Sequence, residues 1–99
     1  MELTERQKKT LRGLGHHLKP VVMLADKGVS ENVGHEIEQA LDFHELIKVS
    51  IRVGDREIRD SWLKEICDST GASLVQRTGN IALLFRRNPK KPKIVLGSR

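Results

Sequence analysis

Two apolar segments flank one amphipathic helix, and this unit restricts the fold more than any other part of the sequence. The first segment, residues 21–24, is a continuous apolar run, which is typical of a strand covered on both faces. In the second, residues 47–53, apolar and polar residues alternate, as in a strand with one polar face. Ser30 can cap a helix of about residues 31–44 between them. Two strands that a helix connects within one sheet must be parallel, so the unit predicts an α/β domain.

The rest of the chain adds two helices and a hairpin to this unit. A capping box begins a helix over about residues 4–14. An apolar stripe over residues 58–67 predicts another helix. Residues 72–78 and 81–85 then predict two strands around a Gly-Asn turn. The expected order is α-β-α-β-α-β-β, in a two-layer α/β domain with a mixed four-stranded sheet.

Length and composition place the chain among small globular proteins. Its 99 residues allow one domain, expected over residues 1–87. Residues 88–99 are basic and interrupted by proline, which indicates a flexible tail. The polar N-terminus suggests no signal peptide, and the single cysteine, Cys67, cannot form an internal disulfide. We therefore expect a cytoplasmic protein with an inert, buried thiol.

Charge is distributed unevenly along the chain. Residues 1–30 contain six basic and three acidic side chains, residues 31–75 contain five and ten, and residues 76–99 contain seven and none. A basic surface assembled from the two ends, with the acidic segment facing away, would suit a polyanion such as RNA.

The loop "ADKG", residues 25–28, connects the first apolar run to the capped helix. A short loop before a helix can direct several backbone N–H groups at one phosphate. Gly28 would permit close approach, and Lys27 would add a mobile positive charge. An ordinary strand-to-helix turn would have the same sequence, so the residues alone leave both interpretations open.

Three stretches of the sequence resemble the CRM domain, named for chloroplast RNA splicing and ribosome maturation, in its bacterial single-domain YhbY-type form. They are "LKPVVMLADKGVSENV", "EIEQALDFHELIKVSI" and "GNIALLFRR". The resemblance implies a fold similar to the C-terminal domain of a bacterial translation initiation factor. It also implies RNA binding and, for bacterial members, association with precursors of the large ribosomal subunit.

The family's G-x-x-G loop corresponds here to Ala25, Asp26, Lys27 and Gly28, with alanine in place of the first glycine. The resemblance implies that this loop contacts RNA. Basic side chains around it complete the expected RNA-binding set: Lys8, Lys9, Arg12, His16, His17, Lys19, Lys48, Arg52, Arg77, Arg86 and Arg87.

Other kinds of site have weaker support in the sequence. The four histidines match no standard metal-site spacing, and no nucleophile–base arrangement can be identified. Trp62 and Phe85 fall on apolar stripes, so we expect no aromatic platform for stacking bases. We expect no metal, no cofactor, no small-molecule substrate, no membrane association and no enzymatic activity.

Two alternatives remain open at this point. One is an enzyme that holds a nucleotide phosphate in the loop, which would require a deep pocket. The other is a protein-interaction module that uses the acidic second helix, with Glu36 and Glu38 in the interface.

Overall fold

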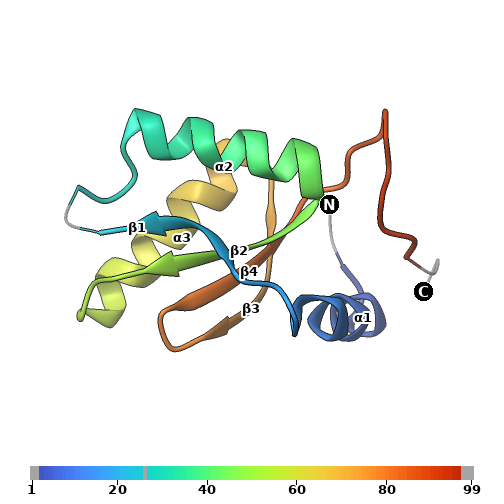
Figure 1. Cartoon of the computed structure of the whole chain (residues 1–99). Coiled ribbons are helices and arrows are strands. Elements are labelled where there is room, and N and C mark those ends of the chain that lie inside the picture. Colours follow the sequence, from blue (N-terminus) through green and yellow to red (C-terminus); the bar gives the residue numbers. More distant parts are fainter. Residues whose placement is uncertain (1–2, 26, 97–99) are drawn as a thin grey trace.

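The computed structural model describes residues 3–25 and 27–96, which form three helices and four strands (Figure 1). They are α1 (Glu5–Gly15), β1 (Pro20–Leu24), α2 (Glu31–His44), β2 (Leu46–Ile51), α3 (Arg56–Thr70), β3 (Ser73–Thr78) and β4 (Ile81–Phe85). The predicted order of elements is confirmed. In the described ranges, no helix has the length and apolar character needed to cross a membrane.

The four strands form one mixed sheet in the order β1-β2-β4-β3. β1 and β2 are parallel, as the strand–helix–strand unit requires, and the other two pairs are antiparallel. β2 and β4 are therefore the central strands.

Helices cover the two faces of the sheet unequally. α2 and α3 pack on one face over a core that includes Ile47, Val49 and Leu84. α1 packs on the other face, where Leu11 belongs to a smaller cluster, and it reaches β2, β4 and β3. The two predicted layers are thus formed by the sheet with α2 and α3. The first helix adds a partial third layer.

The expectation that β1 is covered on both faces is wrong. Val22 and Leu24 are buried, but Val21 and Met23 are 50% and 53% exposed. β1 is an edge strand, and α1 packs on the other three strands. One face of β1 is therefore left open, although its sequence is apolar throughout.

Side chains and one glycine define the helix ends. Thr4 and Gln7 form the predicted capping box of α1. The Ser30 hydroxyl accepts a hydrogen bond from the Val33 N–H, as expected for the start of α2. Gly71, at φ +75°, ends α3 in the left-handed conformation that glycine adopts most readily.

Glu45 connects the end of α2 to the C-terminal segment. Its side chain is buried, and its backbone has a φ of +64°, which is unusual for a residue other than glycine. Its carboxylate accepts hydrogen bonds from the backbone N–H groups of Asn88 (2.6 Å), Lys93 (2.7 Å) and Ile94 (2.8 Å). Burial acts to raise the pKa of this carboxyl, but these donors and the charge of Arg87 lower it more, so the net pKa lies below its ordinary value.

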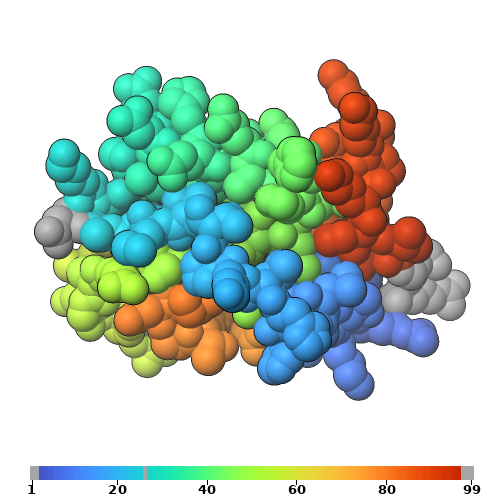
Figure 2. Space-filling model, viewed as in Figure 1, coloured from blue at the N-terminus to red at the C-terminus, as the bar shows by residue number. Residues whose placement is uncertain are grey.

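The C-terminal segment is packed on the domain in its described part, residues 88–96. Ile94 and Leu96 pack against the cluster around Leu11 and Phe85. Figure 2 shows the segment in red against the end of α2 and beside α1. The sequence predicts a flexible tail over residues 88–99, whereas residues 88–96 are packed against the domain. The sequence offered little patterned apolar content there, and the partner, Glu45, is far away in the chain.

We expect removal of residues 88–99 to lower the free energy of unfolding by about 1–3 kcal/mol, since it removes three hydrogen bonds to the Glu45 carboxylate and the packing of Ile94 and Leu96. Chemical denaturation of the full-length and truncated chains would measure this difference. A full-length chain with Lys90→Ala and Lys91→Ala, which are both exposed, is the control and should unfold like the parent. Equal stability of the truncated and full-length chains would contradict the prediction.

The same contacts predict a dependence on pH. A lowered pKa in the folded state stabilises it above the ordinary glutamate pKa of about 4.3, and this stabilisation is lost as the pH falls through the lowered value. The parent should thus have a higher free energy of unfolding than Glu45→Gln at neutral pH. This difference should become smaller as the pH is lowered in denaturation experiments.

Candidate functional site

Beside the C-terminal end of α1, the open part of the sheet forms a groove of about 390 Å³. In the sheet register Lys48 pairs with Leu83 and Ser50 with Ile81, so these residues share the face that carries α1. The groove is lined by Arg12, Gly15, His16, Lys48, Gln76, Thr78, Ile81 and Leu83. One helix end and three strands thus contribute to a single concave surface.

A second cleft, of about 640 Å³, lies where β2 ends and the hairpin turns. It is lined by Ser50, Arg52, Val53, Gly54, Arg59, Asn80 and Ile81. Ile81 lines both hollows, so they are adjoining parts of one surface. We call the lining residues of the two together the basic face.

The basic face has cationic and no anionic side chains among its described lining residues. Arg12, Lys48, Arg52 and Arg59 supply the charge. Within residues 3–25 and 27–96, none of these four forms an ion pair. Unpaired positive charges in a concave surface attract polyanions. The charge of this face therefore suits the phosphate groups of a polyanion.

Gly15 sets the distance between α1 and the sheet. A Cβ at this position would lie 2.7 Å from a methyl group of the buried Leu83. Glycine therefore lets the end of the helix pack closely on β4, and this approach places Arg12 and His16 at the wall of the groove.

The ADKG loop lies at the Arg52 end of the basic face. The backbone N–H of Arg52 donates to the carbonyl oxygen of Leu24, directly before the loop (2.8 Å). The N–H of Gly28 donates to the carbonyl oxygen of Ala25 (2.9 Å), which closes a tight turn. Lys27 is exposed, while Asp26 lies outside the described residues.

Gly28 has a structural role that the sequence did not reveal. Its φ is +62°, and a Cβ there would lie 2.9 Å from ring atoms of Trp62 on α3. The turn and the indole both require glycine. Trp62 is half-buried and also packs on the main core, so it fixes the loop to α3.

Several predicted residues lie near the basic face without lining it. Lys8 is 3.8 Å from a carboxylate oxygen of Glu5. Three further predicted residues on or just after α1 are exposed and line neither hollow: Lys9, His17 and Lys19.

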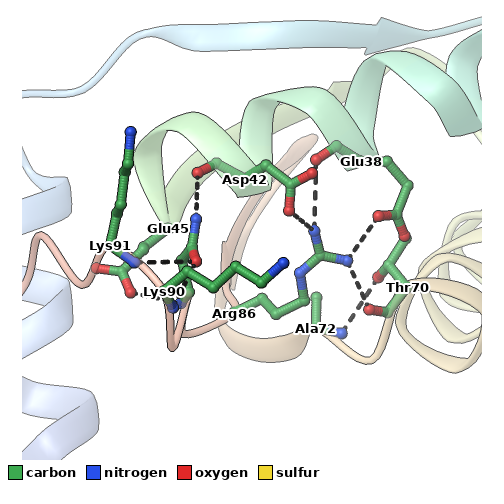
Figure 3. A network of polar contacts seen from close by, with 9 residues as sticks. Glu38, Asp42, Glu45, Thr70, Ala72, Arg86, Lys90 and Lys91 are labelled. Carbon is green, nitrogen blue, oxygen red and sulfur yellow. Dashed lines mark hydrogen bonds and ion pairs between the residues drawn. The ribbon is translucent and has the colours of Figure 1, made fainter.

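Three predicted arginines are engaged elsewhere. Arg77 contacts Asp60 on α3 (3.3 Å), so it points to the opposite face of the sheet. Arg86 bonds to Glu38 (2.8 Å), Asp42 (2.7 Å) and the carbonyl oxygen of Thr70 (2.9 Å), as Figure 3 shows. Its side chain is only 20% exposed.

Arg87 follows Arg86 and lies close enough to Glu45 to lower the pKa of that carboxyl. Arg77, Arg86 and Arg87 thus lie outside the basic face, and Arg86 serves the fold by joining β4 to α2 and α3.

Neither a metal site nor an activated cysteine is found in the described part of the chain. No cluster of three or more His, Cys, Asp or Glu side chains that could hold a metal ion occurs there. Burial raises the pKa of the Cys67 thiol, and the charge of Asp68 raises it further. The thiol is therefore protonated and weakly nucleophilic at neutral pH.

Comparison with known sequences decides the family. Residues 3–86 match the CRS1/YhbY (CRM) domain. The chain belongs to the CRM-domain family. It is 46% identical over 93 residues to a probable RNA-binding protein of Pseudomonas aeruginosa, covering 94% of this chain and 89% of the relative. It is 48% identical over 84 residues to an RNA-binding protein of Haemophilus influenzae, covering 85% of each.

A solved structure shares the fold of this chain. The solution structure of a Staphylococcus aureus protein for which RNA binding has been suggested aligns with a TM-score of 0.82 at 28% identity. The alignment covers 97% of this chain and all of that one.

Two lining residues of the basic face, Arg59 and Asn80, are absent from the set that the sequence predicts. Arg59 lies on α3, whose apolar stripe predicts only core residues, and the Gly79-Asn80 pair predicts only a turn. The structure joins them by a hydrogen bond of 2.6 Å across 21 positions of the chain. No local pattern reports a contact of that kind.

We expect Gly28→Ala to lower the free energy of unfolding by about 2 kcal/mol, since alanine resists positive φ and its methyl group would displace Trp62. Gly34→Ala is the matched control, because nothing lies within 4 Å of its Cβ position inside α2. That change should be neutral or stabilising by up to about 1 kcal/mol. Denaturation curves that show equal losses for both variants would rule out the structural role of Gly28.

Proposed function

We propose that this CRM domain binds structured RNA through the basic face and acts by binding, not as an enzyme. In this proposal its partner is precursor ribosomal RNA of the large subunit, or particles that contain it, in the cytoplasm. The ribosomal role rests on the family resemblance and on nothing in the geometry.

One observation carries the proposal of RNA binding. A continuous concave surface contains four unpaired cations and no described carboxylate, in a chain whose relatives are named as RNA-binding proteins. The acidic helix α2 covers the opposite face of the sheet, so RNA is attracted to one side and repelled from the other.

The aromatic residues favour contacts to the RNA backbone over stacking. Phe85 is 1% exposed, and Trp62 is packed beneath Gly28. Phe43 is 64% exposed, but it lies on α2 with the Lys93 ammonium 4.2 Å from its ring centre. Among the described residues, no Phe, Tyr or Trp lines the basic face, so backbone contacts to a folded RNA are the better fit.

Lys27 and the turn of the ADKG loop extend this surface at the Arg52 end. The proposal includes Lys27 as a phosphate contact and assigns Gly28 to the turn. Lys9, His17 and Lys19 could add outer contacts where the RNA extends past α1.

We expect the affinity for a structured ribosomal RNA fragment to depend strongly on salt. The four arginine and lysine side chains of the basic face, together with Lys27, can neutralise about five phosphates. A plot of the logarithm of the binding constant against the logarithm of the salt concentration should then have a slope of about −3.5 to −4.5. Lys48→Gln should weaken binding to different RNA sequences alike and reduce the slope by about one. Fluorescence titrations at several salt concentrations would measure both effects.

Lys64→Gln is the control for this experiment, because Lys64 is an exposed cation on α3 that lines neither hollow of the basic face. It should bind like the parent. A slope near zero for the parent, or equal losses for the two variants, would contradict the proposal. Crosslinking in cells, followed by sequencing of the bound RNA, would test whether the partner is precursor ribosomal RNA. Sequence reads spread over messenger RNA would contradict that part of the proposal.

A further inference from the structure

We propose that the cleft around Arg59 is a subsite for one ribonucleotide of the bound RNA strand, with its phosphate on Arg59 and Arg52. This inference rests on the proposed function and adds to it a defined position on the protein. It assigns a binding role to Arg59 and Asn80, which lie outside the ADKG loop.

The Arg59 guanidinium is only partly used within the protein. Its Nη1 donates to Oδ1 of Asn80 at 2.6 Å. Its Nε is buried and has no hydrogen-bond partner among residues 3–25 and 27–96. Arg59 also lines the cleft, and a guanidinium carries five N–H donors, of which the Asn80 contact uses one. The N–H groups that face the cleft, and not the buried Nε, can bind a ligand oxygen. Arg52, which is exposed on the same cleft, can bind the same anion.

Asn80 is held so that it can donate to a ligand. The contact with Arg59 occupies its side-chain oxygen, which leaves its amide nitrogen as a donor. Its backbone oxygen is also occupied, by the N–H of Ile51 at 2.7 Å. The polar side chains of the cleft therefore offer mainly donors, and an acceptor-rich group such as a phosphodiester matches them.

The remaining lining suits the rest of a nucleotide. Val53 and Ile81 provide apolar contact for a ribose or a base. The cleft of about 640 Å³ falls in the range of about 300–1,000 Å³ that small-ligand sites occupy. Gly54 keeps one wall free of a side chain.

Continuity with the groove favours a strand over a free nucleotide. Ile81 lines both hollows, and Lys48 and Arg12 follow on the groove side. A strand with one nucleotide in the Arg59 cleft can place its next phosphates on those cations. A free mononucleotide would use only the first part of this surface.

The test compares three full-length variants in titrations with the same structured RNA. Arg59→Gln removes the cation, and Asn80→Asp keeps the acceptor for Arg59 but replaces the amide donor with a negative charge. Arg56→Gln is the matched control, an exposed arginine on the same helix that does not line the cleft. We expect the first two to weaken binding about tenfold and the control by no more than about twofold, as for loss of a charged hydrogen bond.

Circular dichroism would check that each variant is folded, and Asn80→Asp serves as the test if Arg59→Gln is not. Losses in the Arg59 and Asn80 variants that equal the Arg56 control would overturn the subsite. If Lys48→Gln still weakened binding in that case, the proposed function would stand without it. Absence of RNA binding by the parent would instead defeat the proposed function itself.

A second measurement separates a strand from a free nucleotide. Uridine monophosphate should shift the Arg59 Nε–H resonance of the labelled protein only at millimolar concentrations, and the shift should vanish in Asn80→Asp. Binding of the mononucleotide as tight as that of RNA would show a free-nucleotide site and would overturn the proposal.

Discussion

The alternation along β2 determines both the core and the candidate site. Ile47, Val49 and Ile51 point into the main core, whereas Lys48 and Arg52 lie on the basic face. β2 pairs with β1 on one side and β4 on the other, so its register also positions its neighbours. A shift by one residue would drive the basic side chains into the core, where burying a charge is costly. The fold is therefore specified by the same residues that make one face cationic.

The sheet separates opposite charges, and Arg86 takes part in this separation. Its guanidinium joins β4 to Glu38 and Asp42 of α2 and to the end of α3 (Figure 3). These bonds hold the acidic helix against the face opposite the basic one and balance two of its charges. As a result, the Arg86 side chain points away from the proposed RNA surface, although the sequence predicts it as an RNA contact. The C-terminal segment, which Glu45 holds in place, completes the packing at the other end of α1.

The sequence correctly predicted the structural features that depend only on neighbouring residues. The caps at Thr4 and Ser30, the alternation of β2 and the hairpin turn each depend on neighbouring residues, and each is present. The errors concern contacts between distant segments. An apolar run cannot report that its strand lies at an edge, and the tail gives no sign that Glu45, 49 positions before Ile94, will bind it. The sequence predicts Arg12, Lys48 and Arg52 as RNA contacts, and all three line the basic face, whereas no local pattern indicates that Arg59 lies there.

The most direct test of a one-sided RNA surface is a map of amide chemical-shift changes on adding a structured RNA to the labelled protein. The account predicts changes at Lys48, Arg52 and Ile81 and at the end of α1. It also predicts that the exposed side of α2, around Glu31 and Glu36, remains unchanged at matched salt. Changes concentrated on α2, with the basic face unaffected, would contradict the account and favour a protein-interaction role for the acidic helix.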